Sequence, residues 1–456
     1  MGRETYNGER PLTGAVEGVS IDTRRECSGT LFVAIEGENN DGHDYLEDAV
    51  TSGAKALLVS KNKRDKCAGL EVPVFEVEDT VKALQRISSD YKDKIGVRSV
   101  GVTGTTGKTE TKEMLTSMLA EKYRVHATPG NYNNHIGLPL TILGMDEETE
   151  ILVIEMGASR SGEIKLLAGI GKPDIGVITN IGPGHLEFFR SLKGVAEAKS
   201  ELISSLSEEN RAVLPADDDF FEFLKEKTKA DVVSFGFSDD AQWSPEEVES
   251  VNGGGYKFIL GGQAMRINSY GRYHLLNAAA ATAAASCLDV SISDIAGAIG
   301  DFRAVERRGR IFNVGGIVFV NDSYNSNPLS LKSSVEAFME MPVEGRAWLV
   351  LGDMLELGPK SGDLHREVGK FCGRAGVYGL ITMGKKSVEI SREASIQSKA
   401  PDIISHFMDI VKLSRYLNEL LKEGDAVLIK GSRNMGMWKL IDEIEILRET
   451  PKRRVD

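Results

Sequence analysis

The stretch Val100-Gly101-Val102-Thr103-Gly104-Thr105-Thr106-Gly107-Lys108-Thr109 runs from an apolar strand through a glycine-rich turn into a helix. Backbone N–H groups of a turn without bulky side chains can surround phosphate oxygens, and the helix N-terminus adds partial positive charge. Lys108 would reach the terminal phosphates, and the Thr109 hydroxyl could coordinate Mg2+. We therefore predict a nucleotide triphosphate site formed by Gly104, Thr105, Thr106, Gly107, Lys108 and Thr109.

The spacing of this loop departs from the general pattern G-x-x-x-x-G-K-[ST], which has a glycine where Val102 stands. A turn that only connects a strand to a helix is therefore the alternative interpretation. The strand before the loop, and the amphipathic run through Met114, Leu115 and Met118 after it, favour phosphate binding.

Length and composition indicate a globular protein of several domains. The chain has 456 residues, of which 41% are hydrophobic and 27% charged, whereas a single core stops growing beyond roughly 250 to 300 residues. We predict three domains, at residues 1–82, 83–308 and 309–456. No apolar run approaches the ~20 residues that span a bilayer, and the polar start Met1–Tyr6 lacks the apolar core of a signal peptide. We expect a cytoplasmic protein without membrane insertion.

Cysteine usage and net charge argue against several other classes. Cys27, Cys67, Cys287 and Cys372 form no C-x-x-C pair, so we expect reduced thiols and neither a disulfide framework nor a zinc cluster. The net charge of −13 argues against a nucleic-acid partner, which would require a basic stripe. An anionic small substrate is still possible where lysines and arginines gather locally.

Short apolar runs alternate with helical segments along most of the chain, which predicts an α/β fold with mostly parallel sheets. The runs that indicate strands are 30–35, 54–59, 72–77, 97–102, 150–155, 174–179, 317–320, 347–351, 377–382 and 426–429. The last four predict a second doubly wound unit. The segment 300–309, with Arg303, Arg307 and Arg308, is the predicted hinge before it.

Polar residues follow several predicted strands, at the sheet edge where parallel sheets bind ligands. Glu155 ends one strand, and its carboxylate, the Thr109 hydroxyl and phosphate oxygens would make part of a Mg2+ shell. A solvated carboxylate at a strand end is the alternative. His185 lies in the turn after the next strand and Lys199 on a later helix. Taken alone, His185 could be an ordinary loop residue and Lys199 part of a solvated helix face.

Amide side chains are concentrated at 128–139, a segment that contains Asn131, Asn133 and Asn134. Their paired donors and acceptors suit a sugar or peptide ligand, although Asx turns use the same groups without any ligand. In the third predicted domain, two strand-to-loop junctions carry carboxylates and the stretch 430–433 carries cations.

Taken together, these segments resemble the Mur ligase superfamily, the ATP-dependent enzymes that form amide bonds in the peptide of bacterial peptidoglycan. The resemblance spans nearly the whole chain. The loop 103–109 is similar to the superfamily's own phosphate loop, which accounts for Val102. Two stretches are similar to the members that add D-Ala-D-Ala to UDP-N-acetylmuramoyl-tripeptide: Asp322-Ser323-Tyr324-Asn325-Ser326-Asn327-Pro328 and Leu351-Gly352-Asp353-Met354-Leu355-Glu356-Leu357-Gly358.

The resemblance implies a small α/β UDP-substrate domain, a central, mostly parallel P-loop ATPase-like domain and a C-terminal Rossmann-like domain. It also implies roles for single residues. Thr109 and Glu155 would hold Mg2+, and His185 would lie at a second metal site. Lys199 matches the position whose amine is carbamylated, which would turn a cation into an anionic metal ligand. The implied catalytic residues are Lys108, Lys199, His185 and Asp322. The implied nucleotide contacts outside the loop are Asn277, Arg310 and Asp322.

The first domain resembles the family's UDP-sugar-binding module through Ser20-Ile21-Asp22-Thr23-Arg24. The implied substrate contacts are Ser20, Thr23, Arg24, Asn131, Asn133, Asn134, Tyr324 and Asn325. Two adjacent residues depart from the family, which usually has His-Asn where this chain has Tyr273-His274. We therefore carry over no adenine contact there.

The implied reaction uses ATP to convert the tripeptide's terminal carboxylate into an acyl phosphate, which the D-Ala-D-Ala amine then attacks. Two metals would clamp ATP and the carboxylate, and closure about a hinge near Gly309, bringing in Asp322, would assemble the site. We expect a monomer, and either lysine or diaminopimelate at the third peptide position. The alternatives are another amide ligase of the superfamily, including the folyl-polyglutamate type, and a nucleotide-dependent switch that joins nothing.

Overall fold

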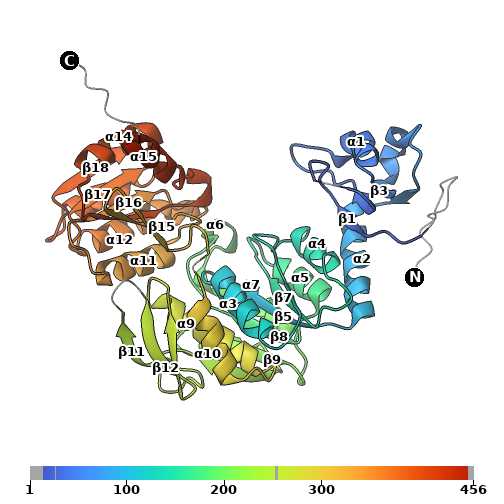
Figure 1. The fold of residues 1–456 in the computed structure, drawn as a ribbon, viewed down its shortest axis with the longest axis horizontal. Helices are drawn as coiled ribbons and strands as arrows, with labels where there is room; N and C mark the ends of the chain where they lie inside the picture. Colours follow the sequence, from blue (N-terminus) through green and yellow to red (C-terminus); the bar gives the residue numbers. More distant parts are fainter. Residues whose placement is uncertain (1–13, 26, 252–254, 304, 450–456) are drawn as a thin grey trace. The chain divides into compact units, whose positions relative to one another are not determined.

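The computed structural model describes residues 14–25, 27–251, 255–303 and 305–449, which divide into two compact units. One unit holds the described residues up to 101 together with 123–157 and 163–174, and the other holds 102–122, 158–162 and those from 175 onward. Both units combine helices and strands, which confirms the predicted α/β class (Figure 1). The domain boundaries at 82/83 and 308/309 stay predictions.

The first unit opens with a four-stranded, wholly parallel sheet. Its strands are β1 Gly18–Ser20, β2 Thr30–Val33, β3 Ala56–Ser60 and β4 Val74–Val77, accompanied by η1 Gly42–Tyr45, α1 Leu46–Thr51 and η2 Lys61–Cys67. They lie in the order β1-β2-β3-β4. Phe32 and Leu57 pack into the core on one face, and Val33 and Leu58 pack into the core on the other. Both faces are buried, as is usual for parallel strands.

The rest of this unit contains the strand that ends at Glu155. Its elements are α2 Thr80–Ile95, β6 Val125–Ala127, α4 Gly137–Leu143, β7 Ile151–Glu155 and α5 Glu163–Gly171. Helix α2 begins at the N-cap Asp79, whose carboxylate accepts from the N–H of Lys82, and ends at Gly96 with a φ of 72°. Strands β6 and β7 are parallel, and β7 is buried along its whole length. Strand β5, Arg98–Thr103, has residues in both units.

The second unit begins with helices and strands that surround the loop. They are α3 Lys108–Ala120, β8 Ile175–Ile178, α6 Leu186–Phe189, α7 Leu192–Ser204, β9 Arg211–Pro215, α8 Phe221–Glu226, β10 Asp231–Phe235, α9 Tyr273–Ser286 and α10 Ile292–Asp301. Strands β8, β9 and β10 are parallel. The alanine-rich helix α9 packs against α3, because small side chains allow close approach. An antiparallel sheet that the sequence analysis did not predict comprises β11 Glu246–Ser250, β12 Tyr256–Leu260 and β13 Gln263–Ile267.

A six-stranded sheet completes the second unit. Its elements are β14 Arg310–Val314, β15 Ile317–Asp322, α11 Pro328–Glu340, β16 Ala347–Gly352, η3 Gly358–Lys360, α12 Ser361–Cys372, β17 Gly379–Met383, α13 Val388–Ser395, β18 Ile403–Phe407, α14 Ile410–Leu420, β19 Ala426–Lys430, η4 Arg433–Met435 and α15 Lys439–Glu449. The strand order is β14-β15-β19-β16-β17-β18, parallel except for the β14–β15 hairpin. Helices α11 to α13 cover one face, and α14 and α15 cover the other (Figure 1). This is the predicted doubly wound unit.

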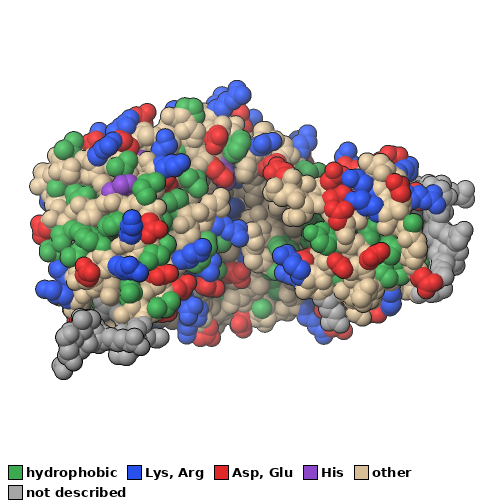
Figure 2. Space-filling model, turned by 90° about the horizontal axis from the view of Figure 1, so that it is seen from above, with side chains coloured by type: hydrophobic (Ala, Val, Ile, Leu, Met, Phe, Trp, Pro, Cys, Tyr) green, Lys and Arg blue, Asp and Glu red, His purple; other side chains and the backbone are tan. Residues whose placement is uncertain are grey.

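The surface carries charges of both signs. On the face shown in Figure 2, basic and acidic side chains are interspersed. Within the part of the chain that the structure describes, no helix combines the length and the apolar character needed to cross a bilayer. All four cysteines are free thiols, as predicted.

Candidate active site

The predicted phosphate loop is the turn between β5 and α3. Gly104 and Gly107 have φ values of 148° and 77°, and α3 begins at Lys108. A Cβ on Gly104 would lie 2.0 Å from Thr179 Oγ1, and a Cβ on Gly107 would lie 2.3 Å from Asn277 Oδ1. Both positions require glycine, because a side chain would displace the polar groups around the loop.

The end of β8 holds the loop in shape. The N–H of Thr105 donates to Asn180 O at 3.1 Å, and the N–H of Thr106 donates to Asn180 Oδ1 at 3.0 Å. Thr179 Oγ1 donates to Thr106 O at 2.5 Å. The sequence analysis gave no role to Thr179 or Asn180, although their position directly after a parallel strand was a signal that could have found them.

Lys108, the predicted phosphate-binding cation, folds back over this loop. Its Nζ donates to the carbonyl oxygens of Gly104 at 2.9 Å and Thr105 at 3.2 Å. The ammonium therefore lies beside the backbone that would surround a phosphate, where its charge can act on the terminal phosphates of a nucleotide.

Glu155 ends β7 with its side chain buried, only 2% exposed. Asn133 Nδ2 donates to Glu155 Oε1 at 2.7 Å, and Thr128 Oγ1 accepts from the N–H of Glu155 at 2.9 Å. Gly157 makes room for this arrangement, since a Cβ there would lie 2.9 Å from Asn133 Cγ. The carboxylate is thus held in one orientation, and the solvated alternative does not describe it.

The other two amides of the asparagine-rich segment differ from Asn133. Asn134 Oδ1 accepts hydrogen bonds from the N–H groups of Ile136 at 3.1 Å and Gly137 at 2.8 Å, at the start of α4. This is the local capping use of the side chain that the sequence analysis left open. Asn131 is exposed. Contact of these amides with a substrate stays a prediction.

His185 and Lys199 both lie close to the ring of Phe189. The His185 and Phe189 ring centroids are 6.4 Å apart, and Lys199 Nζ is 5.9 Å from the Phe189 centroid. Lys199 is only 3% exposed, on α7. Burial lowers the pKa of His185; the Glu356 carboxylate, 2.6 Å from Nδ1, opposes that shift, and the charges of Lys108 and Lys199 add to it. The structure brings these two predicted metal-site residues together and favours a neutral imidazole, the form that binds metals.

Three polar side chains of the described helix α9, those of His274, Asn277 and Thr282, have buried atoms without hydrogen-bond partners. Among the described residues, Asn277 Nδ2 and both ring nitrogens of His274 have no hydrogen-bond partner. Asn277 is 6% exposed and His274 is 0% exposed. The His274 and Tyr273 ring centroids are 4.4 Å apart. Buried polar groups without partners are costly, and a ligand would satisfy them. For Asn277, beside Gly107, this fits the predicted nucleotide contact.

Asp322 lies in a buried ion pair at the end of β15. Lys430 Nζ donates to Asp322 Oδ2 at 2.6 Å, and Ser334 Oγ donates to the same oxygen. Asp322 and Lys430 are 8% and 2% exposed. Arg310, another predicted nucleotide contact, is exposed at the start of β14. The roles of Asp322 and Arg310 toward a nucleotide stay predictions.

Two arginines approach the predicted substrate residue Tyr324. The guanidinium carbon of Arg308 is 4.0 Å from the centroid of its ring, and that of Arg433 is 5.6 Å away. Asn325 Oδ1 accepts a hydrogen bond from the N–H of Ser326 at 2.9 Å. Cations beside an aromatic ring suit an anionic or planar ligand.

A buried ion pair joins α3 to the segment before β14. Arg308 Nη1 lies 3.2 Å from Glu110 Oε2, with side chains 17% and 9% exposed. Burial is the largest single influence and would raise the pKa of Glu110, but the opposing influences together outweigh it. The charge of the Arg308 guanidinium is the largest of these, and the pKa is lowered. The sequence analysis placed Arg308 at the hinge but did not predict its partner, which is 198 positions away.

We expect Arg308→Leu to lower the free energy of unfolding by about 3 kcal/mol at pH 7, because Glu110 stays charged and buried without its partner. A carboxyl group with a lowered folded pKa stabilises the fold above its unfolded pKa of about 4.3, and this contribution is lost as the pH falls through the folded value. The difference between variant and parent should therefore shrink below about pH 4. Denaturant unfolding at both pH values measures it.

Arg392→Leu is the matched control for this experiment, because Arg392 pairs with Glu389 in an exposed ion pair. Its loss should change the free energy of unfolding by less than about 0.5 kcal/mol. An equal loss of unfolding free energy in both variants would show that leaving Glu110 buried without its partner costs no more than losing an exposed ion pair.

The predicted UDP contacts Ser20, Thr23 and Arg24 lie at the end of β1 and in the loop that follows it. Arg24 Nε and Nη2 donate to the two carboxylate oxygens of Asp22 at 2.8 and 2.7 Å, and the Arg24 side chain is 88% exposed. These hydrogen bonds lower the pKa of Asp22 to about 2. Ser20 Oγ accepts from the N–H of Asp22 at 3.3 Å, and Thr23 is half-buried. A diphosphate at Arg24 would compete with the Asp22 carboxylate.

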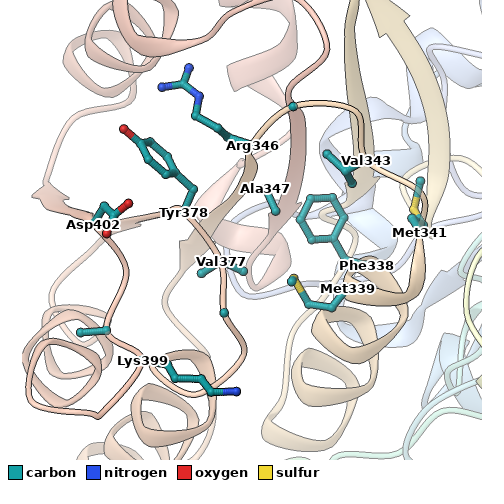
Figure 3. Close-up of a pocket in the computed structure, with 13 residues that line it drawn as sticks. Phe338, Met339, Met341, Val343, Arg346, Ala347, Val377, Tyr378, Lys399 and Asp402 are labelled. Carbon is teal, nitrogen blue, oxygen red and sulfur yellow. The ribbon is translucent and has the colours of Figure 1, made fainter.

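Figure 3 shows a hollow elsewhere in the second unit, beside the starts of β16 and β17. Phe338, Met341 and Val377 form its apolar part, and Arg346 and Asp402 lie among its polar residues. None of the predicted site residues is among those that line it. Parallel sheets bind ligands at the carboxyl ends of their strands, so this hollow lies at the wrong edge for the candidate site.

The donors found here fit Mg2+. Within the described ranges, no three His, Cys, Asp or Glu side chains gather as a metal site. Mg2+ keeps several waters and needs only one or two carboxylates beside phosphate oxygens. The buried, oriented carboxylate of Glu155 in the first unit and the hydroxyl of Thr109 in the second, a residue 6% exposed, are each an oxygen ligand of this kind. Their joint binding of Mg2+ stays a prediction.

A phosphate loop that depends on two glycines, within an α/β architecture that ends in a doubly wound sheet, defines a nucleotide-binding protein. Three family descriptions match successive parts of the chain: "Mur ligase family, catalytic domain" over residues 15–92, "Mur ligase middle domain" over 102–285, and "Mur ligase, glutamate ligase domain" over 307–433. The chain belongs to the Mur ligase family.

Individual relatives match over nearly the full length. A Bacillus subtilis protein named UDP-N-acetylmuramoyl-tripeptide--D-alanyl-D-alanine ligase is 34% identical, over 94% of this chain and 93% of that protein. A crystal structure of MurF from Acinetobacter baumannii has a TM-score of 0.85 at 26% identity, covering 94% of each chain. MurF ligase from Thermotoga maritima in complex with ADP has a TM-score of 0.82 at 30% identity, covering 94% of this chain and 97% of that one. The predicted family and three-domain fold are confirmed.

Proposed function

We propose that this protein is an ATP-dependent ligase that joins D-Ala-D-Ala to the terminal carboxylate of UDP-N-acetylmuramoyl-tripeptide. Similarity over the full length to relatives with that name supports the choice of substrates, and the ADP complex of the Thermotoga maritima structure supports the nucleotide. Within this chain, the proposal is carried by the phosphate loop, with Lys108 folded across it. We place the proposed reaction in the cytoplasm, where ATP is available.

The chemistry follows from the difficulty of making an amide in water, where a carboxylate repels a nucleophile and its oxygen leaves poorly. A carboxylate oxygen of the tripeptide attacks the γ-phosphorus of ATP, the bond to the β–γ bridging oxygen breaks, and ADP leaves. The neutral amine of D-Ala-D-Ala then attacks the carbonyl carbon of the acyl phosphate. Collapse of the tetrahedral intermediate expels phosphate, and the nitrogen loses a proton. Lys108 offsets negative charge on the transferring phosphoryl oxygens.

The surrounding residues of the chain orient this chemistry. Bound through Glu155 and Thr109, Mg2+ would supply positive charge to the phosphate oxygens. Asn133 keeps the Glu155 carboxylate in one orientation. His185 offers a neutral imidazole, and a carbamate on the buried Lys199 would add anionic oxygen ligands. The shared packing of His185 and Lys199 near Phe189 supports their acting in one site.

Asn133→Ala is expected to raise the Mg2+ concentration for half-maximal rate about 10-fold, because the Glu155 carboxylate loses the donor that orients it. The rate at saturating Mg2+ should fall much less. Asn131→Ala is the matched control, since its exposed amide does not touch Glu155, and its Mg2+ dependence should equal that of the parent. A higher KM for the UDP substrate in Asn133→Ala, with unchanged Mg2+ dependence, would instead favour the substrate role predicted from the sequence.

The proposed function is tested by mixing the protein with ATP, Mg2+, D-Ala-D-Ala and UDP-N-acetylmuramoyl-tripeptides that carry either lysine or diaminopimelate. We expect phosphate release in a 1:1 ratio with a product of pentapeptide mass, and only when all components are present. ATP hydrolysis without product would favour the nucleotide-dependent switch. Product formation with a different amino acid would favour another ligase of the family.

A further inference from the structure

The turn around His185 touches a second segment of the chain, the loop 353–358 that follows β16. Both belong to the second unit. The N–H of Glu187 donates to Glu356 O at 3.2 Å, and Glu356 Oε2 lies 2.6 Å from His185 Nδ1. A Cβ on Gly358 would lie 2.9 Å from Glu187 Cα, so this close approach requires glycine.

Both residues of the side-chain contact have unusual backbones. His185 has a φ of 51° and Glu356 a φ of 60°, in the left-handed region that non-glycine residues rarely adopt. Such conformations persist where the surroundings impose them, and they are common at functional sites. Two strained turns therefore meet through their side chains, with a backbone hydrogen bond beside them.

The contact places the negative charge of Glu356 beside His185, where the other charges that act on the ring are positive. Lys108 and Lys199 act on His185 as cations, and Glu356 is the carboxylate that balances them at the imidazole. The Glu356 oxygen is close to Nδ1 but not aligned with the ring as a hydrogen bond requires. Hydrogen bonds in active sites often become aligned only when the substrates are bound.

We propose that Glu356 is a positioning residue that sets the orientation of the His185 ring through Nδ1. A contact at Nδ1 leaves Nε2 as the ring nitrogen able to face a metal ion or phosphate group. Because Glu356 lies in the loop after β16, this contact makes the orientation of His185 depend on the docking of the C-terminal sheet against the phosphate-loop region. The expected effect on the ligation rate rests on the proposed function, whereas the contact between Glu356 and His185 does not.

Glu356→Ala is the first test, with Glu187→Gln as the matched control, because Glu187 is an exposed carboxylate two residues from His185. We expect Glu356→Ala to lower the kcat of ligation about 30-fold with less than a twofold change in the KM for ATP. Glu356→Gln keeps an oxygen acceptor and should recover most of the rate. Glu187→Gln should stay within twofold of the parent.

Glu356→Gly separates positioning from backbone strain. Glycine relieves the strain at φ 60°, so this variant should be at least as stable as the parent, yet as slow as Glu356→Ala. Recovery of the parental rate in Glu356→Gly would show that strain, not the carboxylate, matters, and would overturn the proposal.

A second readout needs neither metal nor turnover. The side-chain nitrogen signals of the seven histidines are recorded by NMR in protein without nucleotide or Mg2+, and the His185 signal is identified by its loss in His185→Gln. We expect the Nδ1 signal to shift in Glu356→Ala and to stay in place in Glu187→Gln. An unmoved signal together with a parental rate would overturn the proposal. Absence of ligation in the parent would instead count against the proposed function, while the NMR result still decides whether the contact exists.

Discussion

Replacing Lys108 with alanine should lower kcat for ligation about 1000-fold while leaving the protein folded. The ammonium lies across the carbonyls of Gly104 and Thr105, beside the backbone that would receive the γ-phosphate. Phosphoryl transfer is catalysed mainly by positioning and by charge that stabilises the transferring oxygens. Loss of one such preorganised group commonly costs about 100-fold to 1000-fold. Stopped assays of pentapeptide product, with thermal unfolding to confirm the fold, measure the effect.

Lys193→Ala is the control for this experiment. Lys193 is exposed on α7, so its replacement by alanine removes one positive charge from the surface and leaves the phosphate loop unchanged. It should ligate within twofold of the parent. If the folded Lys108→Ala protein also ligated at that rate, the phosphate loop would have no part in the reaction.

Gly107→Ala should weaken ADP binding about 100-fold. A methyl group there would lie 2.3 Å from Asn277 Oδ1, so either the loop or Asn277 must move. The positive φ of 77° adds a cost of roughly 1 to 2 kcal/mol for any L-residue. Because the clash with Asn277 lies in the nucleotide site itself, the affinity for ADP should fall far more than the free energy of unfolding. Calorimetric titration with ADP measures the affinity.

Gly96→Ala separates the two effects. Gly96 ends α2 with a φ of 72°, close to that of Gly107, and a Cβ there would have no neighbour within 4 Å. This variant should lose stability through its backbone alone and bind ADP like the parent. Equal loss of ADP affinity in both variants would contradict the steric explanation.

Local patterns predicted much of this architecture. The β5–α3 junction was recognisable because an apolar run, glycines and Gly-Lys-Thr are contiguous, and the buried strands β7, β8, β16 and β19 were visible as short apolar runs. Strand β11, with the sequence Glu-Glu-Val-Glu-Ser, was missed because it has no such run. The β14–β15 hairpin does have a local signal in the sequence, because Gly315 and Gly316 form a two-residue turn with positive φ values.

The contacts within the site were harder to predict. Clustered amides suggested a ligand site, but only the structure shows Asn133 on the Glu155 carboxylate and Asn134 at the start of α4. The Glu110–Arg308 pair and the approach of Glu356 to His185 join residues far apart along the chain. No local pattern encodes such pairs, because they arise from packing of the whole fold.

The central claim, that the tripeptide carboxylate is phosphorylated by ATP before the amine attacks, is tested most directly with oxygen isotopes. UDP-N-acetylmuramoyl-tripeptide labelled with 18O in its terminal carboxylate is converted in the presence of ATP, Mg2+ and D-Ala-D-Ala, and the released phosphate is analysed by mass spectrometry. If an acyl phosphate forms, each released phosphate carries one 18O atom, and the amount of labelled phosphate equals the amount of pentapeptide formed. Pentapeptide formed with unlabelled phosphate would contradict it.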